Sequence, residues 1–197
     1  LMAGRVPLPS REVVARLLEA ERLDIGGLDQ PVSRARDGDP AAPLARYFVI
    51  HDTSTPFYGD DPFPADIDGN ARVNSFAPYF PANADPEKFP VAHLFLNRIG
   101  QVLVGQPLSR PWRATKLETR VIGLPAKGLF LHVETVMPRR RDPAIEGWND
   151  AIAPDPGFSA RQYDRLALLY IALSVRAGAW LIPAQHATMD HGLPQAH

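Results

Sequence analysis

The sequence predicts a single domain of the mixed α/β class, with a central mixed β-sheet flanked by helices. Three observations support this prediction. The 197 residues suit one full-sized domain. Short apolar runs of strand length alternate along the chain with segments of helical periodicity. Apolar residues make up 45% of the chain and charged residues 22%, which is ordinary for a folded protein with a substantial core.

Charge and cysteine content narrow the classes of function. The formal net charge of -1 gives no overall field that would attract nucleic acid, so no nucleic-acid partner is expected. The chain has no cysteine, which excludes thiolate chemistry and requires any metal ligand to be His, Asp or Glu. No apolar run approaches the ~20 residues of a membrane-spanning helix, so no transmembrane segment is expected. The oligomeric state is left open.

The first elements are a helix, a loop and a strand. Ser10 precedes residues 13–18, whose apolar side chains recur at helical spacing and predict an amphipathic helix. Residues 29–43 are rich in Pro, Gly, Asp and Arg, which predicts a loop. Residues 47–50 form an uninterrupted apolar run typical of a short buried strand, and His51 lies at its carboxyl end.

The middle of the chain predicts a long loop, a hairpin and a further strand. Residues 56–90 combine many prolines, aspartates and aromatics without periodicity, which predicts a long loop packed by its own Phe and Tyr side chains. We expect this loop to be functional and to wall a cleft. Residues 93–104 have the pattern of strand, tight turn and strand. Residues 128–136 predict a strand whose period of two places His132 and Glu134 on the same face.

The last elements are a buried helix and a short strand. Ser159 and Gln162 have the spacing of a capping box, and the apolar run of residues 163–175 follows directly. Gly178 is a suitable residue to end this helix. Residues 180–183 then predict a short strand.

Two histidines are candidate zinc ligands. His51 and His186 each follow a short apolar strand, and strand ends deliver side chains to a cleft in α/β folds. A catalytic zinc ion takes three protein ligands and leaves a fourth position open. Asp190, His191 and His197 are the candidates for the third ligand. The alternative is that these histidines are hydrogen-bonding residues of the core or surface.

Glu134 is the candidate general base. A carboxylate on an otherwise apolar strand is costly to bury unless it is paired or has a raised pKa, and a raised pKa suits a general base. The alternative interpretation is a salt bridge from Glu134 to Arg113 or Lys116.

Arginines and a tryptophan leave two interpretations open. The run of residues 139–141 consists of three arginines between prolines, which is typical of a solvated loop but also suits carboxylate binding. Trp112, beside Arg113, either lines a cleft or belongs to the core.

Taken in order, these segments resemble the zinc-dependent N-acetylmuramoyl-L-alanine amidase family (amidase type 2), which includes the peptidoglycan recognition proteins and certain phage lysins. The segments that carry the resemblance are "YFVIHDTS" with His51, "HLFLNRIGQVL" from His93, "LFLHVETV" with Glu134, "SARQYDRLALLYIALSVRAG", and "LIPAQH" with His186. The resemblance covers the chain from about residue 47 to the end. It implies an amidase-like catalytic domain of residues 45–197, preceded by a helix and loop extension of residues 1–44.

The resemblance implies a Zn²⁺ ion bound by His51, His186 and a third ligand. The family usually supplies that ligand as Asp or Cys in a Lys-x-Asp setting, which this sequence lacks. His197 lies nearest to the family's spacing and is the expected ligand, with Asp190, His191 or a residue beyond the chain end as alternatives. Ala92 stands where many family members have a tyrosine.

The implied activity is hydrolysis of the amide between N-acetylmuramic acid and the L-alanine of peptidoglycan stem peptides. Zinc would polarise the carbonyl and activate water, and Glu134 would move the proton to the leaving amine. His132 or His197 would stabilise the oxyanion, and the expected substrate-binding residues are His93, Trp112, Arg113 and His132. Peptidoglycan or muropeptide fragments are therefore the expected partners.

The implied location is the bacterial cell envelope, periplasmic or secreted, although no signal sequence is recognised in this chain. Two alternatives remain at this point. One is a non-catalytic peptidoglycan-binding module on the same fold, and the other is a zinc hydrolase that acts on a different amide or ester.

Overall fold

Five strands form one mixed sheet in the order β3-β2-β4-β1-β5. The computed structural model describes residues 6–36 and 38–194. The strands are β1 (Tyr47–Asp52), β2 (Leu94–Leu96), β3 (Val102–Val104), β4 (Phe130–Thr135) and β5 (Ile182–Gln185). Neighbouring strands are parallel except for the β2–β3 hairpin, which is antiparallel. The mixed α/β class and the hairpin are therefore confirmed.

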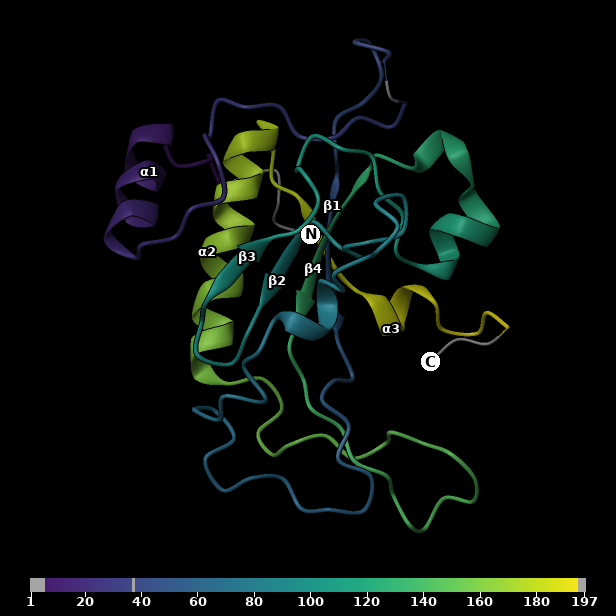
Figure 1. The fold of residues 1–197 in the computed structure, drawn as a ribbon. Coiled ribbons are helices and arrows are strands. Elements are labelled where there is room, and N and C mark those ends of the chain that lie inside the picture. Colours follow the sequence, from purple (N-terminus) through teal and green to yellow (C-terminus); the bar gives the residue numbers. More distant parts are fainter. Residues whose placement is uncertain (1–5, 37, 195–197) are drawn as a thin grey trace.

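The two faces of the sheet have different coverings (Figure 1). Helix α2 (Ala160–Ala177) packs on one face, and α1 (Arg11–Ala20) lies against α2. The opposite face meets the π-helical turn η2 (Leu117–Ile122) and the short helix α3 (His186–Met189). Two 3-10 turns complete the elements, η1 (Ala77–Tyr79) and η3 (Leu124–Ala126). The sheet is thus enclosed between a helical layer and a layer of turns.

Both long helices begin where their sequences predict, and α2 also ends at the predicted residue. Ser10 accepts a hydrogen bond from the Val13 N–H and caps α1. Ser159 and Gln162 form both bonds of the capping box at the start of α2, and Gly178 ends this helix with a left-handed φ of 74°. Among the described residues, none of the helices has the length and apolar character needed to cross a bilayer.

The N-terminal segment packs into the same core as the sheet and α2. Apolar residues of α1 and of the segment that follows it join this core: Val14, Leu18, Leu23, Ile25, Leu28 and Val32. Arg176 of α2 donates hydrogen bonds to the carbonyl groups of Ile25, Gln30 and Pro31. The segment expected as an extension is therefore a structural part of the domain.

Gly128 brings the start of β4 into close contact with the N-terminal segment. A Cβ atom at this position would lie 1.5 Å from the carbonyl oxygen of Arg34. The Ser33 hydroxyl donates a hydrogen bond to the Gly128 carbonyl oxygen at 2.8 Å. Only glycine permits this approach of two backbones.

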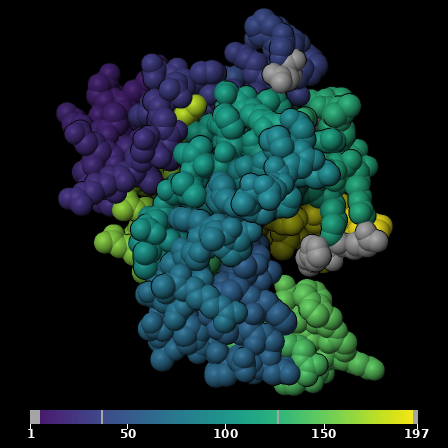
Figure 2. All heavy atoms as spheres, viewed as in Figure 1, coloured from purple at the N-terminus to yellow at the C-terminus, as the bar shows by residue number. Residues whose placement is uncertain are grey.

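Two long loops extend beyond the carboxyl ends of β1 and β4 (Figure 1). One connects β1 to β2 and contains the predicted loop of residues 56–90. The other, residues 136–159, connects β4 to α2 and forms a separate green lobe at the lower right of Figure 2. The carboxyl ends of the parallel strands and the base of these loops are where the candidate site lies.

Candidate active site

Parallel pairing brings the predicted histidine and glutamate together. In the register of β1 with β4, His51 lies opposite Glu134 and Val49 lies opposite His132. These side chains all project from the face opposite α2, because alternate residues of a strand share a face. On the other side of β1, strand β5 leads directly into α3, whose first residue is His186.

Three predicted site residues converge at the strand ends. The ring centroids of His51 and His186 are 4.5 Å apart. Nδ1 of His51 lies 3.7 Å from Oε1 of Glu134. A cavity of about 550 Å³ opens here, and both histidines line it. The structure therefore joins two imidazoles and one carboxyl group, which come from distant segments.

Glu134 is buried in a way that favours its protonated form. Its side chain is 13% exposed, and burial, followed by the charge of Asp52, raises the pKa of Glu134 to about 8. Its carboxyl group contacts the His51 ring, and in the described part of the chain no salt bridge joins Glu134 to Arg113 or Lys116. A carboxyl group with a pKa near neutrality exchanges protons readily at the pH of most cells.

His51 is held neutral by its surroundings. Burial lowers its pKa well below the ordinary value, and the neighbouring His132, His186 and His93 lower the pKa further. A neutral imidazole keeps a lone pair on one ring nitrogen, which is the form that binds metal ions. The electrostatics of the site therefore agree with metal ligation by His51.

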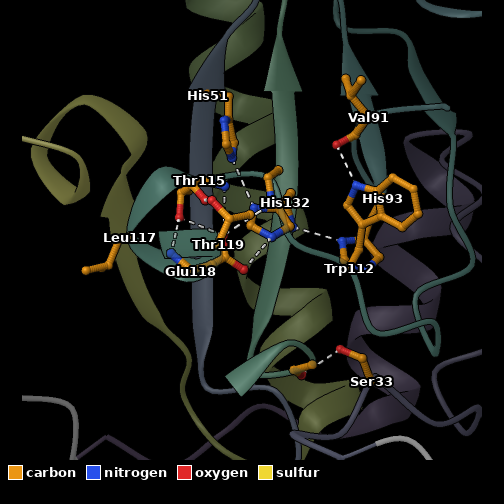
Figure 3. Close-up of polar contacts among 12 residues, drawn as sticks. Ser33, His51, Val91, His93, Trp112, Thr115, Leu117, Glu118, Thr119 and His132 are labelled. Carbon is orange, nitrogen blue, oxygen red and sulfur yellow. Dashed lines mark hydrogen bonds and ion pairs between the residues drawn. The ribbon is translucent and has the colours of Figure 1, made fainter. Parts of the chain in front are cut away.

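His132 and His93 form a buried layer behind the cavity (Figure 3). Nδ1 of His132 lies 3.0 Å from Nε2 of His51, and the His132 ring is fully buried. The backbone N–H of His132 donates to Nδ1 of His93, whose Nε2 donates to the carbonyl oxygen of Arg110. Burial, followed by His132, lowers the pKa of His93 to about 3. Both rings thus support the site and do not line the cavity.

Trp112 and Arg113 also lie away from the cavity lining. The indole N–H of Trp112 donates to the Val91 carbonyl oxygen at 2.9 Å, and the ring is 7% exposed. The Arg110 guanidinium lies 5.1 Å from its centroid. Arg113 is partly exposed and does not line the cavity either. Of the two interpretations of Trp112, the structure supports the core residue.

The wall of the cavity comes from the loop between β4 and α2. Its lining includes Arg139, Trp148 and Asp150, whereas residues 56–90 do not contribute to it. Residues 56–90, expected to wall the cleft, therefore do not line this cavity themselves, although Phe57 packs against Trp148. Tyr58 and Phe63 pack against each other, as expected for this loop, and Tyr79 and Phe80 pack against Phe95 of β2. Trp148 was not expected at the site, since nothing in its local sequence relates it to the strand ends.

Two of the three arginines of residues 139–141 bind carboxylates of the protein itself, and Arg140 donates to the backbone carbonyl oxygen of Asp60. Arg139 pairs with Asp52 at the end of β1, and Arg141 pairs with Asp60. The Asp52 pair fixes the loop to the strand that carries His51. The run is thus neither a fully solvated face nor a free anion site.

Asp190 and His191 have different surroundings. Asp190 is buried, and its two carboxylate oxygens accept hydrogen bonds from the N–H groups of Lys116 and Leu117. Burial alone raises the pKa of Asp190, but these two N–H groups and the ring of His186 outweigh that effect and lower it overall. His191 is exposed in the turn that follows α3.

His51 and His186 fit two positions of a zinc site, since both are neighbouring imidazoles on one cavity. Within residues 6–36 and 38–194, no three His, Cys, Asp or Glu side chains converge closely enough to hold a metal ion. His197, the expected third ligand, lies outside the described residues.

The site therefore combines a neutral His51 ring next to the ring of His186, a proton-accepting carboxyl group and a loop wall with an exposed aromatic ring. No family model, no curated protein and no solved structure matches the chain.

Proposed function

We propose that this protein is a zinc-dependent amide hydrolase that cleaves the bond between N-acetylmuramic acid and L-alanine in peptidoglycan. The observation that carries the proposal is the convergence of His51, His186 and Glu134 at the strand ends, where the two histidines line one cavity and Glu134 contacts His51. The choice of substrate is supported by the resemblance of the strand, hairpin and helix segments to N-acetylmuramoyl-L-alanine amidases. Such a substrate would place the protein's action in the bacterial cell envelope.

His51 and His186 are the residues that would hold the zinc ion, with His197 as the proposed third ligand. Zinc bound by these side chains supplies a Lewis acid for the amide carbonyl and lowers the pKa of water. The neutral state of His51 supports this assignment, because a protonated imidazole has no lone pair to donate.

Glu134 is the proposed general base and acid. Its carboxylate takes a proton from the attacking water and returns it to the nitrogen of the leaving L-alanine. A pKa of about 8 supports both transfers near neutral pH, because neither form of the group is strongly disfavoured. The contact with His51 orients Oε1 toward the imidazole pair.

The cavity has the chemistry to hold a substrate that is part sugar and part peptide. Its volume of about 550 Å³ lies within the range of small-molecule sites. The Trp148 side chain is 76% exposed and its ring lies 6.0 Å from that of Phe57, so an aromatic surface is available beside the cavity. Arg139 and Asp150 add polar groups to the same wall.

Elemental analysis tests the metal site. Protein purified without chelator or a histidine tag is expected to contain about one zinc ion per chain. His51→Ala and His186→Ala are each expected to lose that zinc, whereas His191→Ala, which changes an exposed histidine, is expected to keep it. A folded protein that takes up no zinc after zinc is added back would exclude the proposed mechanism.

Digestion of purified muropeptides tests the reaction. Mass spectrometry is expected to detect free stem peptide together with a sugar that retains its lactyl group. Binding of muropeptides without turnover, unchanged in His51→Ala, would instead identify a peptidoglycan-binding module. Zinc binding with turnover of other amides or esters, and none of muropeptides, would identify a different zinc hydrolase.

A further inference from the structure

One short turn contacts the residues that hold the rings of His51 and His186 in place. Residues 114–118, here called the anchoring turn, lie at the start of η2. Glu118 of this turn is fully buried, and its Oε2 accepts hydrogen bonds from the N–H groups of Ala114 and Thr115 and from the Thr115 hydroxyl. These three donors fix the orientation of the carboxyl group inside the protein.

The other oxygen of Glu118 faces His132. Oε1 lies 3.3 Å from Nε2 of His132, and both groups are completely buried. The two atoms lie at ion-pair distance but not in hydrogen-bond alignment, and in the described part of the chain neither has another hydrogen-bond partner. Because a carboxylate oxygen can only accept, this contact requires a proton on Nε2 of His132.

The position of that proton determines the tautomer of His51. With its proton on Nε2, His132 presents a lone pair at Nδ1, which lies 3.0 Å from Nε2 of His51. Nε2 of His51 must then donate, so the ring carries its proton there and its lone pair on Nδ1. That Nδ1 is the atom nearest to Glu134, at the cavity. In Figure 3, dashed lines connect Glu118 to His132 and His132 to His51.

The same turn orients His186 through a second carboxylate. The N–H groups of Lys116 and Leu117 each donate to Asp190 at 2.9 Å. Oδ2 of Asp190 lies 2.9 Å from Nε2 of His186, which therefore donates to it. The lone pair of His186 is left on Nδ1, for which the described residues supply no hydrogen-bond donor.

We propose that the anchoring turn is the positioning element of the site, and that Glu118 and Asp190 set both His51 and His186 in the Nε2–H tautomer with their Nδ1 lone pairs free. The further step, in which these lone pairs bind zinc, rests on the proposed function. Asp190 is then a positioning residue and not the third ligand. Carboxylates that orient metal-binding histidines in this way commonly strengthen metal affinity about 10–100-fold.

The tautomers can be measured without any metal. Long-range ¹H–¹⁵N correlation spectra of the full 197-residue chain, labelled on its histidines and stripped of metal, are expected to show His51 and His186 protonated at Nε2. Assignment uses the His51→Ala and His186→Ala variants. Finding the proton of either ring on Nδ1 would overturn the proposal, and this result needs no variant of the turn to fold.

Glu118→Gln gives a directional test. The Oε2 position receives three donors, so the amide oxygen belongs there and the NH₂ group faces His132. Nε2 of His132 must then accept, so His132 carries its proton on Nδ1 and donates it to Nε2 of His51. The His51 ring in turn carries its own proton on Nδ1. We expect zinc affinity, measured by chelator competition, to fall about 10–100-fold. Glu87→Gln is the matched control, because Glu87 is exposed in its pair with Arg110.

Asp190→Asn tests the second support and separates it from direct ligation. We expect zinc to bind about 10–100-fold more weakly and the absorption spectrum of the cobalt-substituted protein to stay unchanged. A changed cobalt spectrum would show that Asp190 is a ligand and would overturn its positioning role.

The outcomes distinguish this inference from the proposed function. Nε2–H tautomers in a protein that binds no zinc would support the positioning role and exclude the zinc hydrolase. Zinc binding by Glu118→Gln as tight as by Glu87→Gln would overturn the positioning role and leave the hydrolase standing.

Discussion

Burial of Glu134 lowers the stability of the folded protein at alkaline pH and also gives this carboxyl group the pKa of a general base. Its side chain is nearly buried, and its pKa is raised to about 8 mainly by that burial. Between pH 4.5 and 8 the folded protein holds a proton on this group that the unfolded chain releases. Stability contributed by this group is therefore present below pH 4.5 and is lost as pH rises toward 8.

Glu134→Gln should stabilise the metal-free protein at alkaline pH. The amide removes the ionisation that opposes burial, and each pKa unit corresponds to ~1.4 kcal/mol, so we expect a gain of a few kcal/mol at pH 8. The gain should shrink as pH is lowered to 5, as followed by thermal melting in chelator. Glu19→Gln on the exposed face of α1 serves as control. An equal or lower melting temperature at pH 8 would contradict the buried-acid interpretation.

The same substitution should remove hydrolysis while keeping the metal. Loss of a general base typically lowers the rate about 10²–10⁴-fold. We therefore expect Glu134→Gln to retain zinc at the wild-type level and to lose muropeptide turnover by this factor. Unchanged turnover in the zinc-loaded variant would assign proton transfer to another residue.

At the scale of elements, local patterns predicted the regular structure well. The capping box of Ser159 and Gln162, the helix stop at Gly178 and the hairpin all depend on residues that are close in sequence. The anchoring turn was not predicted, because its role depends on contacts with residues far away in sequence. Glu118 contacts His132, and the N–H groups of the turn bind Asp190. Contacts of this kind produce no periodicity or characteristic spacing of residues that could be recognised in the sequence.

Gly128→Ala tests the contact between β4 and the N-terminal segment. A methyl group there collides with backbone atoms of Arg34, which cannot move aside as a flexible side chain can. We expect a loss of about 3 kcal/mol or more in the free energy of unfolding, measured in urea. Gly69→Ala is the control, since its Cβ would make only an ordinary contact at 3.8 Å. Equal stabilities of the two variants would show that the N-terminal segment separates from β4 easily.

At the scale of the whole molecule, the N-terminal segment and the sheet form one core. Deleting residues 1–44 removes α1 and strips Arg176 of the carbonyl groups that it binds. We expect the truncated chain to lose cooperative thermal unfolding and to aggregate, because the apolar face of α2 becomes exposed. A soluble truncated chain with a sharp melting transition would show that residues 45–197 fold on their own.

The sequence indicated which strand ends carry the site but not what encloses it. His51, Glu134 and His186 were found because each follows or lies on a recognisable strand. His93, Trp112 and Arg113 were expected to bind substrate beside them, yet they do not line the cavity, and the rings of His93 and Trp112 are buried. The wall formed by residues 139–158 is joined to the end of β1 by the Arg139–Asp52 pair, a contact between distant segments.

The position of β1 between β4 and β5 also has a meaning for biosynthesis. His51 leaves the ribosome early, but its strand can pair only after residues 130–135 and 182–185 have been made. Closing these parallel pairs requires the long intervening connections to be in place. A nascent or prematurely terminated chain therefore holds an isolated histidine and an open strand edge. The imidazole pair forms only when synthesis has passed residue 186, so the order of translation itself delays the site.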